Sequence, residues 1–308
     1  MKTANALPFD LPALTARWGR RPGVSFAPMY GGMVALLESS ASRAIVALQG
    51  AQVLSWNKRD DPADVLWLSP MANLATRNAV RGGIPVCWPW FGPHSSDTTK
   101  PAHGIARTQS WRVTGSAASA RYARLVLAIE TVGAPTDAWP YRAKAEIEIT
   151  VGEKLTVALT TDNLGPVPFT MTEALHTYLQ VGNIADVNVE GLAGKTYIDQ
   201  LQGGARKTAA AAPITITAEA DLAFIDTPET VTVRDAALAR EITVAKTGSL
   251  STVVWNPWIE KGARLGDLGD EGYQHMLCVE AANVFDNAVV LEPRGRHRLM
   301  TEISVRSR

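Results

Sequence analysis

Two side chains of this 308-residue chain are suited to acid–base chemistry, and the first is His176. Read as one extended strand, residues 167–179 place His176 on the same side as Thr170 and Thr172, opposite Phe169 and Met171. This polar side weakens the interpretation of His176 as an ordinary core histidine, although a plain solvent-facing strand remains an alternative. An imidazole with a pKa of about 6.5 gives or takes a proton near neutral pH.

The second is Glu280, within the segment His-Met-Leu-Cys-Val-Glu-Ala-Ala-Asn that spans residues 275–283. Apolar residues flank it on both sides of the expected pleat, so the pattern predicts a buried carboxyl group. Burial of an unpaired carboxylate is costly and raises its pKa toward the range of a useful general base. The alternative is a structural glutamate held in a buried salt bridge.

A third segment, residues 81–94, reads Arg-Gly-Gly-Ile-Pro-Val-Cys-Trp-Pro-Trp-Phe-Gly-Pro-His. Its glycines allow close backbone approach and its prolines stiffen the loop. Trp88, Trp90 and Phe91 offer flat apolar faces that suit the C–H faces of a sugar ring. The alternative is a tightly packed loop whose aromatic rings belong to the core.

A fourth segment, Ala-His-Gly-Ile-Ala-Arg at residues 102–107, brings His103 and Arg107 close together after a Ser/Thr/Pro-rich loop. Arginine forms bidentate hydrogen bonds to phosphate or carboxylate and keeps its charge at all relevant pH values. A surface arginine beside a structural histidine is the alternative. Further along, Trp255 and Asp267 add an aromatic ring and a carboxylate ahead of Glu280.

Short runs rich in Val, Ile, Thr and aromatic residues must position these side chains. They occupy residues 33–38, 43–48, 111–115, 125–131, 145–151, 155–161, 214–217, 230–234, 241–245, 276–280 and 299–305. Helical periodicity is nearly absent, apart from a turn or two within 71–79, and 203–212 is expected to be a surface loop. The pattern predicts an all-β fold, a large antiparallel β-sandwich of two packed sheets. No linker divides the chain, which indicates one domain over residues 1–308, with 1–22 as a candidate peripheral extension.

Composition excludes several classes of protein. The 30 basic and 30 acidic residues cancel, which disfavours a nucleic-acid binder, and 46% hydrophobic residues disfavour disorder. The two cysteines, Cys87 and Cys278, suggest buried thiols in a reducing cytoplasm, and no signal peptide or membrane-spanning run is recognisable. The spacings typical of metal, nucleotide or serine-nucleophile sites are missing, so neither a metal nor another cofactor is expected.

Five ordered blocks carry a resemblance to a known family. RGGIPVCWPWFGPH, AHGIAR, LHTY, WNPW and DLGDEGYQHMLCVEAAN, spread over about residues 66–284, resemble the glucose-6-phosphate 1-epimerase (hexose-6-phosphate mutarotase) branch of the aldose 1-epimerase superfamily. The resemblance implies the galactose mutarotase-like β-supersandwich. It also implies that His176 is the general acid and Glu280 the general base.

The resemblance implies substrate-binding roles for six further residues. Arg81 and Arg107 would hold the phosphate, His103 the sugar hydroxyls or ring oxygen, and Trp255, Asp267 and Asp226 would line the sugar site. One block departs from the family pattern, in which a sugar-binding Asp precedes a Tyr by three residues. The candidate Asp226 is followed at that spacing by Glu229.

The implied activity is cofactor-free exchange of the α and β anomers of a hexose 6-phosphate, by ring opening and closure, in a monomer. Three alternatives stay open: a mutarotase for free aldoses, a non-catalytic carbohydrate-binding or sensor protein on the same fold, and a structural interaction protein. The presence of both His176 and Glu280 favours an enzyme. Two arginines suffice for one phosphate, so zero net charge is compatible with a small anionic substrate.

Overall fold

The computed structural model describes residues 9–61, 63–131 and 139–307, and it is an all-β structure, as the sequence predicts. The helices of this described part are α1 (Leu11–Trp18) and α2 (Trp258–Arg264). The strands are β1 (Val24–Met29), β2 (Gly32–Glu38), β3 (Ser42–Ala47), β4 (Val53–Lys58), β5 (Val86–Cys87), β6 (Arg112–Ala118), β7 (Ala123–Glu130), β8 (Ala143–Val151), β9 (Leu155–Asn163), β10 (Phe169–Met171), β11 (Glu173–Leu175), β12 (Tyr178–Gln180), β13 (Val187–Glu190), β14 (Thr196–Asp199), β15 (Ala205–Thr208), β16 (Ala220–Ile225), β17 (Val231–Asp235), β18 (Arg240–Thr247), β19 (Ser251–Asn256), β20 (Met276–Asn283), β21 (Val289–Leu291) and β22 (Arg296–Ser307).

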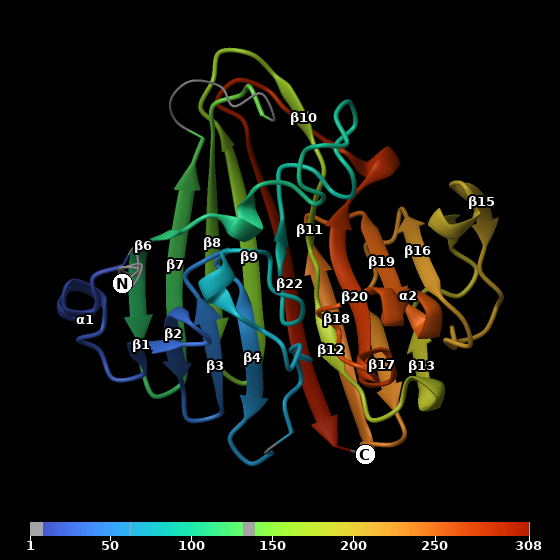
Figure 1. The fold of residues 1–308 in the computed structure, drawn as a ribbon, viewed down its shortest axis with the longest axis horizontal. Helices are drawn as coiled ribbons and strands as arrows, with labels where there is room; N and C mark the ends of the chain where they lie inside the picture. Colours follow the sequence, from blue (N-terminus) through green and yellow to red (C-terminus); the bar gives the residue numbers. More distant parts are fainter. Residues whose placement is uncertain (1–8, 62, 132–138, 308) are drawn as a thin grey trace, which may run out of the picture.

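One eight-stranded sheet forms the back of the molecule, in the order β13-β17-β18-β22-β9-β8-β7-β6 (Figure 1). A second eight-stranded sheet, the site sheet, runs β15-β14-β16-β19-β20-β11-β5, with β12 also paired to β20. A four-stranded sheet, β1-β2-β3-β4, and the β10-β21 pair complete the fold. The strand pairs within these sheets are antiparallel.

The back sheet is covered by two sheets rather than the single one expected. Strands β1–β3 of the four-stranded sheet contact β6, β7 and β8, whereas β11 and β20 of the site sheet contact β22. Side chains from all three sheets meet in one continuous core. The sandwich is therefore wide, because its long back sheet spans both covering sheets (Figure 1).

Strand β8 shows how a period of two builds this core. Its residues are alternately buried and partly exposed along the whole strand, and Ile147 and Ile149 are fully buried. On the outer side, Glu146 and Glu148 form ion pairs with Lys144 and Arg124. The predicted half-buried strand is confirmed.

Several local predictions are wrong. Residues 214–217 form no strand, and Ile214 makes only an isolated bridge to Val189. Part of the expected loop 203–212 is strand β15, which pairs with β14 in register. By contrast, the helical turn predicted within 71–79 is confirmed, as the short 3-10 helix Leu74–Thr76.

Both helices lie in segments for which no helix was predicted. The capping signal of α1 was present, because the Asp10 side chain accepts a hydrogen bond from the backbone N–H of Ala13, and Pro12 lies in the first turn. Neither helix in the described residues is long and apolar enough to span a bilayer.

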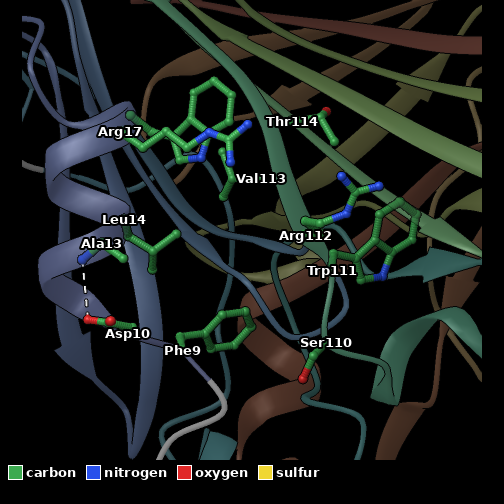
Figure 2. A pocket seen from close by; sticks show the side chains of 11 residues that line it. Phe9, Asp10, Ala13, Leu14, Arg17, Ser110, Trp111, Arg112, Val113 and Thr114 are labelled. Carbon is green, nitrogen blue, oxygen red and sulfur yellow. Dashed lines mark hydrogen bonds between the residues drawn. The ribbon is translucent and has the colours of Figure 1, made fainter.

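A groove of about 490 Å³ lies between α1 and the edge strand β6 (Figure 2). Phe9, Trp18 and Trp111 give it an apolar lining, and Arg17 and Arg112 add two cations. None of the predicted site residues lines it, so the candidate site lies elsewhere.

Candidate active site

Alternation along β20 divides its residues between two faces of the site sheet. Leu277, Val279 and Ala281 join the main core against the back sheet. Cys278 and Ala282 belong to a separate apolar cluster on the opposite face, which we call the site face. Glu280 lies between these two in the alternation and therefore points to the site face.

Cross-strand register aligns a row of side chains beside Glu280 on this face. Asp221 of β16 lies opposite Trp255 of β19, Trp255 opposite Cys278 of β20, and Cys278 opposite Tyr178 of β12. Directly opposed residues in antiparallel strands point to the same face. This row lies two residues along β20 from Glu280.

His176 occupies the break between β11 and β12. Its backbone N–H donates to the carbonyl of Pro85 at 3.0 Å, and that of Tyr178 donates to Gly83 at 2.9 Å. The segment that follows Arg81 therefore lies beside residues 176–178 and is hydrogen-bonded to them. The observed break at 176–177 interrupts the single strand expected over 167–179 but preserves the predicted alternation, with Leu175 and Leu179 in the main core.

The two predicted acid–base residues meet at the site face. His176 Nε2 lies 3.4 Å from Glu280 Oε1, and the two residues are 8% and 1% exposed. The contact lacks hydrogen-bond geometry, and no hydrogen-bond partner in the described residues reaches His176 Nδ1 or either carboxyl oxygen of Glu280. Buried polar atoms are nearly always paired, so three orphaned atoms in one place mark a position where a polar ligand would complete the site.

Burial pushes the proton affinities of the pair in opposite directions. Desolvation, followed by the nearby charge of Asp221, raises the pKa of Glu280 well above its usual value. Desolvation, followed by the influence of His103, Arg107 and Arg81, lowers the pKa of His176 well below its usual value. Both directions disfavour the state with an ionised Glu280 and a protonated His176. The two residues therefore share a single proton, held on Glu280, across a wide range of pH.

Aromatic rings fix the orientation of the His176 imidazole. The Tyr178 ring stacks on it at 4.8 Å and 10°. His103 and Trp255 approach it edge-on, at 5.7 and 6.0 Å between ring centroids. Trp255 is itself buried, so its ring offers little open surface to a sugar.

His103 enters the site on a strained turn. Its backbone φ is +62°, and Gly104 follows at +78°. A Cβ on Gly104 would lie 2.0 Å from the carbonyl oxygen of Trp88, so the turn requires glycine there. The backbone N–H of Gly92 donates to His103 Nδ1 at 3.3 Å, which leaves Nε2 to carry the proton of the neutral ring. Burial lowers the pKa of His103 to about 3, so the ring is neutral.

Arg107 supplies a positive charge near the pair. Its guanidinium donates through Nη2 to the carbonyl of Ala102 at 2.5 Å, and its buried Nε has no hydrogen-bond partner in the described part of the chain. It also forms none of the ion pairs identified among those residues, and its charge contributes to the pKa shifts of His176, His103 and Glu280. The geometry suits recognition of an anion beside the acid–base pair.

Arg81 is also brought to the site, but it already has a carboxylate partner. Its Nε donates to Asp267 Oδ1 at 2.7 Å, and Nη1 donates to the Tyr178 hydroxyl at 3.3 Å. Asp267 therefore holds Arg81 in place, and the sugar contact expected of Asp267 stays a prediction. Nη2 of Arg81 remains for a second ligand.

The structure does not bring Asp226 to the pair. It follows the last residue of β16, is exposed, and accepts a hydrogen bond from Asn287 Nδ2 at 2.9 Å. The carboxylate of this strand that reaches the site face is Asp221, which the sequence analysis missed. The signal was present, because Asp221 precedes the aromatic residue Phe224 by the expected three residues.

The aromatic residues of segment 81–94 are divided between the core and the site. Trp88 is fully buried, and its indole N–H donates to Thr161 Oγ1 at 3.0 Å, as expected of a core residue. Phe91 packs edge-on against His103 at 4.9 Å between ring centroids.

Cys87 and Cys278 are both buried free thiols, as predicted. No group of three potential metal-ligating side chains occurs in the residues that the structure describes.

The chain is similar in sequence to known proteins along most of its length. The family model for aldose 1-epimerase matches residues 33–304. A protein of Escherichia coli K12 named "Putative glucose-6-phosphate 1-epimerase" is 33% identical over 83% of this chain and 84% of its own length. A protein of the same name from Cenchrus ciliaris is 33% identical over 82% of this chain and 79% of its own.

Solved structures share the architecture. A Salmonella typhimurium protein described as a "putative mutarotase" superposes with a TM-score of 0.86 and 29% identity, over 94% of this chain and 95% of that one. Galactose 1-epimerase of Lactobacillus acidophilus has a TM-score of 0.72 at 14% identity, over 92% and 98% of the two chains. The second likeness concerns the fold alone, and it agrees with the expected galactose mutarotase-like supersandwich.

Proposed function

Since the chain belongs to the aldose 1-epimerase family, we propose that it interconverts the α and β anomers of a hexose 6-phosphate, with glucose 6-phosphate as the expected substrate. The observation that carries the proposal is the buried contact between His176 and Glu280, in which three polar atoms have no hydrogen-bond partner among the described residues. A structural salt bridge would satisfy those atoms. An acid–base pair that awaits a sugar would not.

In the proposed reaction Glu280 takes the proton of the C1 hydroxyl while His176 gives a proton to the ring oxygen. The C1–O5 bond breaks and a C1 aldehyde forms. Rotation about C1–C2 presents the other carbonyl face, and the reverse transfers close the ring as the other anomer. Neither proton is consumed, and each transfer contributes about 10²- to 10⁴-fold to the rate.

The His176–Glu280 pair carries one proton both without substrate and during the proposed reaction. Ring opening starts from ionised Glu280 and protonated His176, and it ends with both groups neutral. The burial-driven pKa directions favour the neutral pair, which is the state that accompanies the open-chain aldehyde. A sugar between the two groups would replace their 3.4 Å contact by hydrogen bonds to O1 and O5.

Arg107 and Arg81 would hold the 6-phosphate. Arg107 has no carboxylate partner among the described ion pairs, and a guanidinium in that state is available for bidentate phosphate binding. Arg81 would add one donor while Asp267 keeps its orientation. His103, with its proton on Nε2, would donate to a sugar hydroxyl, and Asp221 would accept from another.

The test compares glucose 6-phosphate and glucose in the same polarimetric assay of anomer exchange. We expect faster exchange for the phosphate ester, with the preference lost in Arg107→Ala. Equal acceleration of both sugars would favour the alternative, a mutarotase for free aldoses. Sugar binding without acceleration would favour a non-catalytic carbohydrate-binding protein and overturn the proposal.

Three broader expectations remain proposals. We propose one domain over residues 1–308, because the core runs through all three large sheets of the described chain. We propose a monomer that acts on a small phosphosugar, to be tested by sedimentation equilibrium. We propose a cytoplasmic location, in keeping with the two buried free thiols, to be tested by cell fractionation.

A further inference from the structure

Helix α2 places Lys261 at the edge of the site, near Asp221 and Trp255. It begins two residues after β19 ends, and Lys261 lies on its second turn. The Lys261 ammonium lies 5.9 Å from the centroid of the Trp255 ring. It lies 2.9 Å from Glu219 Oε1 and 4.0 Å from Asp221 Oδ2.

Asp221 is held from both sides. Gln200 Nε2 donates to its Oδ1 at 2.5 Å, and Lys261 faces its Oδ2. Among the residues that the structure describes, Lys261 is the only cation within ion-pair distance of this carboxylate. The shorter contact with Glu219 fixes the ammonium in turn, so the lysine side chain is anchored at its charged end.

The surroundings of Asp221 explain why such a partner matters. Burial raises its pKa to about 6, Lys261 and the Gln200 hydrogen bond oppose that rise, and Glu219 and Asp199 add to it. Asp221 is also the acidic group whose charge raises the pKa of Glu280. The ionisation and orientation of Asp221 therefore affect both a sugar contact and the proposed base.

We propose that Lys261 is a positioning residue for anomer exchange, which acts through Asp221. Together with Gln200 it holds the Asp221 carboxylate at the site face, beside Trp255, where that carboxylate accepts a hydrogen bond from a sugar hydroxyl. Lys261 itself touches no reacting atom. The inference rests on the proposed function for its catalytic consequence, although the contact with Asp221 can be tested without turnover.

The test replaces the charge and keeps the length, in Lys261→Met. We expect KM for glucose 6-phosphate to rise about two- to fivefold, because sugar binding weakens, and kcat to change less than KM does. Lys261→Arg should restore most of the affinity. The matched control is Lys195→Met, which removes an ion pair with Glu229 and should leave both constants unchanged.

A second readout is independent of activity. The carboxyl group of Asp221, assigned by its loss in Asp221→Asn, is titrated by 13C NMR in the wild type and in Lys261→Met. We expect its pKa to rise in the variant, because an opposing positive charge is gone. In a double-mutant cycle, Lys261→Met should add little to the KM effect of Asp221→Asn.

The outcomes separate the two proposals. An unchanged Asp221 titration in folded Lys261→Met would overturn the positioning role, as would additive KM effects in the cycle. Absence of anomer exchange in the wild type would instead refute the proposed function, and the NMR titration would still decide whether Lys261 controls Asp221.

Discussion

Replacement of Glu280 by glutamine should inactivate the protein and make it more stable. The amide keeps the shape of the buried carboxyl but cannot accept the C1 proton, so kcat should fall by about 10²- to 10⁴-fold. Binding of glucose 6-phosphate should change by no more than about threefold, because the phosphate and hydroxyl contacts remain.

The gain in stability follows from the raised pKa of Glu280. A carboxyl whose pKa is raised by folding holds its proton more tightly in the native state, so the free energy of unfolding falls as pH rises above its ordinary value of 4.5. At about 1.4 kcal/mol per pH unit, the cost at pH 7 cannot exceed about 3 to 4 kcal/mol, however far the pKa is raised. Glutamine removes that cost, and the rise in Tm should reach up to about 7 °C at roughly 2 °C per kcal/mol.

The assay pairs calorimetry at pH 4.5 and pH 7 with polarimetry and isothermal titration. The stability gain should appear at pH 7 and nearly vanish at pH 4.5, where the wild-type carboxyl is protonated in the native state and half protonated in the unfolded state. Glu173→Gln is the matched control, since Glu173 is also fully buried but accepts from Asn283 and pairs with His297 at 3.0 Å. It should lose stability, because glutamine removes the negative charge that His297 faces in this buried pair.

Two results would refute this reasoning. A lower Tm for Glu280→Gln at pH 7 would show that the carboxylate is held by a structural interaction. Turnover close to that of the wild type would show that another group is the base.

Three further predictions concern the same site. Arg107→Ala should lower kcat/KM for glucose 6-phosphate by about 10- to 150-fold, the worth of one charged hydrogen bond, and leave glucose unchanged. Arg112→Ala, which removes an exposed arginine of β6, is the control, and an equal loss for both sugars would contradict a phosphate role. The pH profile of kcat/KM for glucose should show a plateau through neutrality. The rate should fall only at low pH, where the His176–Glu280 pair gains a second proton, and at high pH, where it loses its one proton. A single step at about pH 6.5 would show instead that an independent histidine titrates. Glucose is used there because a phosphate monoester itself titrates near about 6. Gly104→Ala should lower Tm and activity together, since its Cβ would lie 2.0 Å from the Trp88 carbonyl oxygen, whereas Gly194→Ala, with a φ of +71° and nothing within 4 Å, should cost only about 1–2 kcal/mol of backbone strain. Equal losses in the two variants, measured by calorimetry, would show that crowding at Gly104 is not the cause.

Local sequence pattern was sufficient for those features whose cause is local. The alternation around Ile147 and Ile149 identifies a half-buried strand because side chains of a strand point to opposite faces in turn. The apolar flanks of Glu280 predict its burial for the same reason, and the residue is 1% exposed. His176 likewise points away from the core because it alternates along one segment with the core residues Leu175 and Leu179.

Pairing between distant segments was decided only by the tertiary structure. His176 and Glu280 are 104 residues apart, and they meet because β11 pairs with β20, with Ala174 opposite Ala282 and Leu175 opposite Ala281. Register also distinguishes Asp221 from Asp226, since Asp221 lies opposite Trp255, whereas Asp226 lies beyond the end of β16. A local pattern can assign a residue to a face, but which strands become neighbours depends on the burial of all the sheets together.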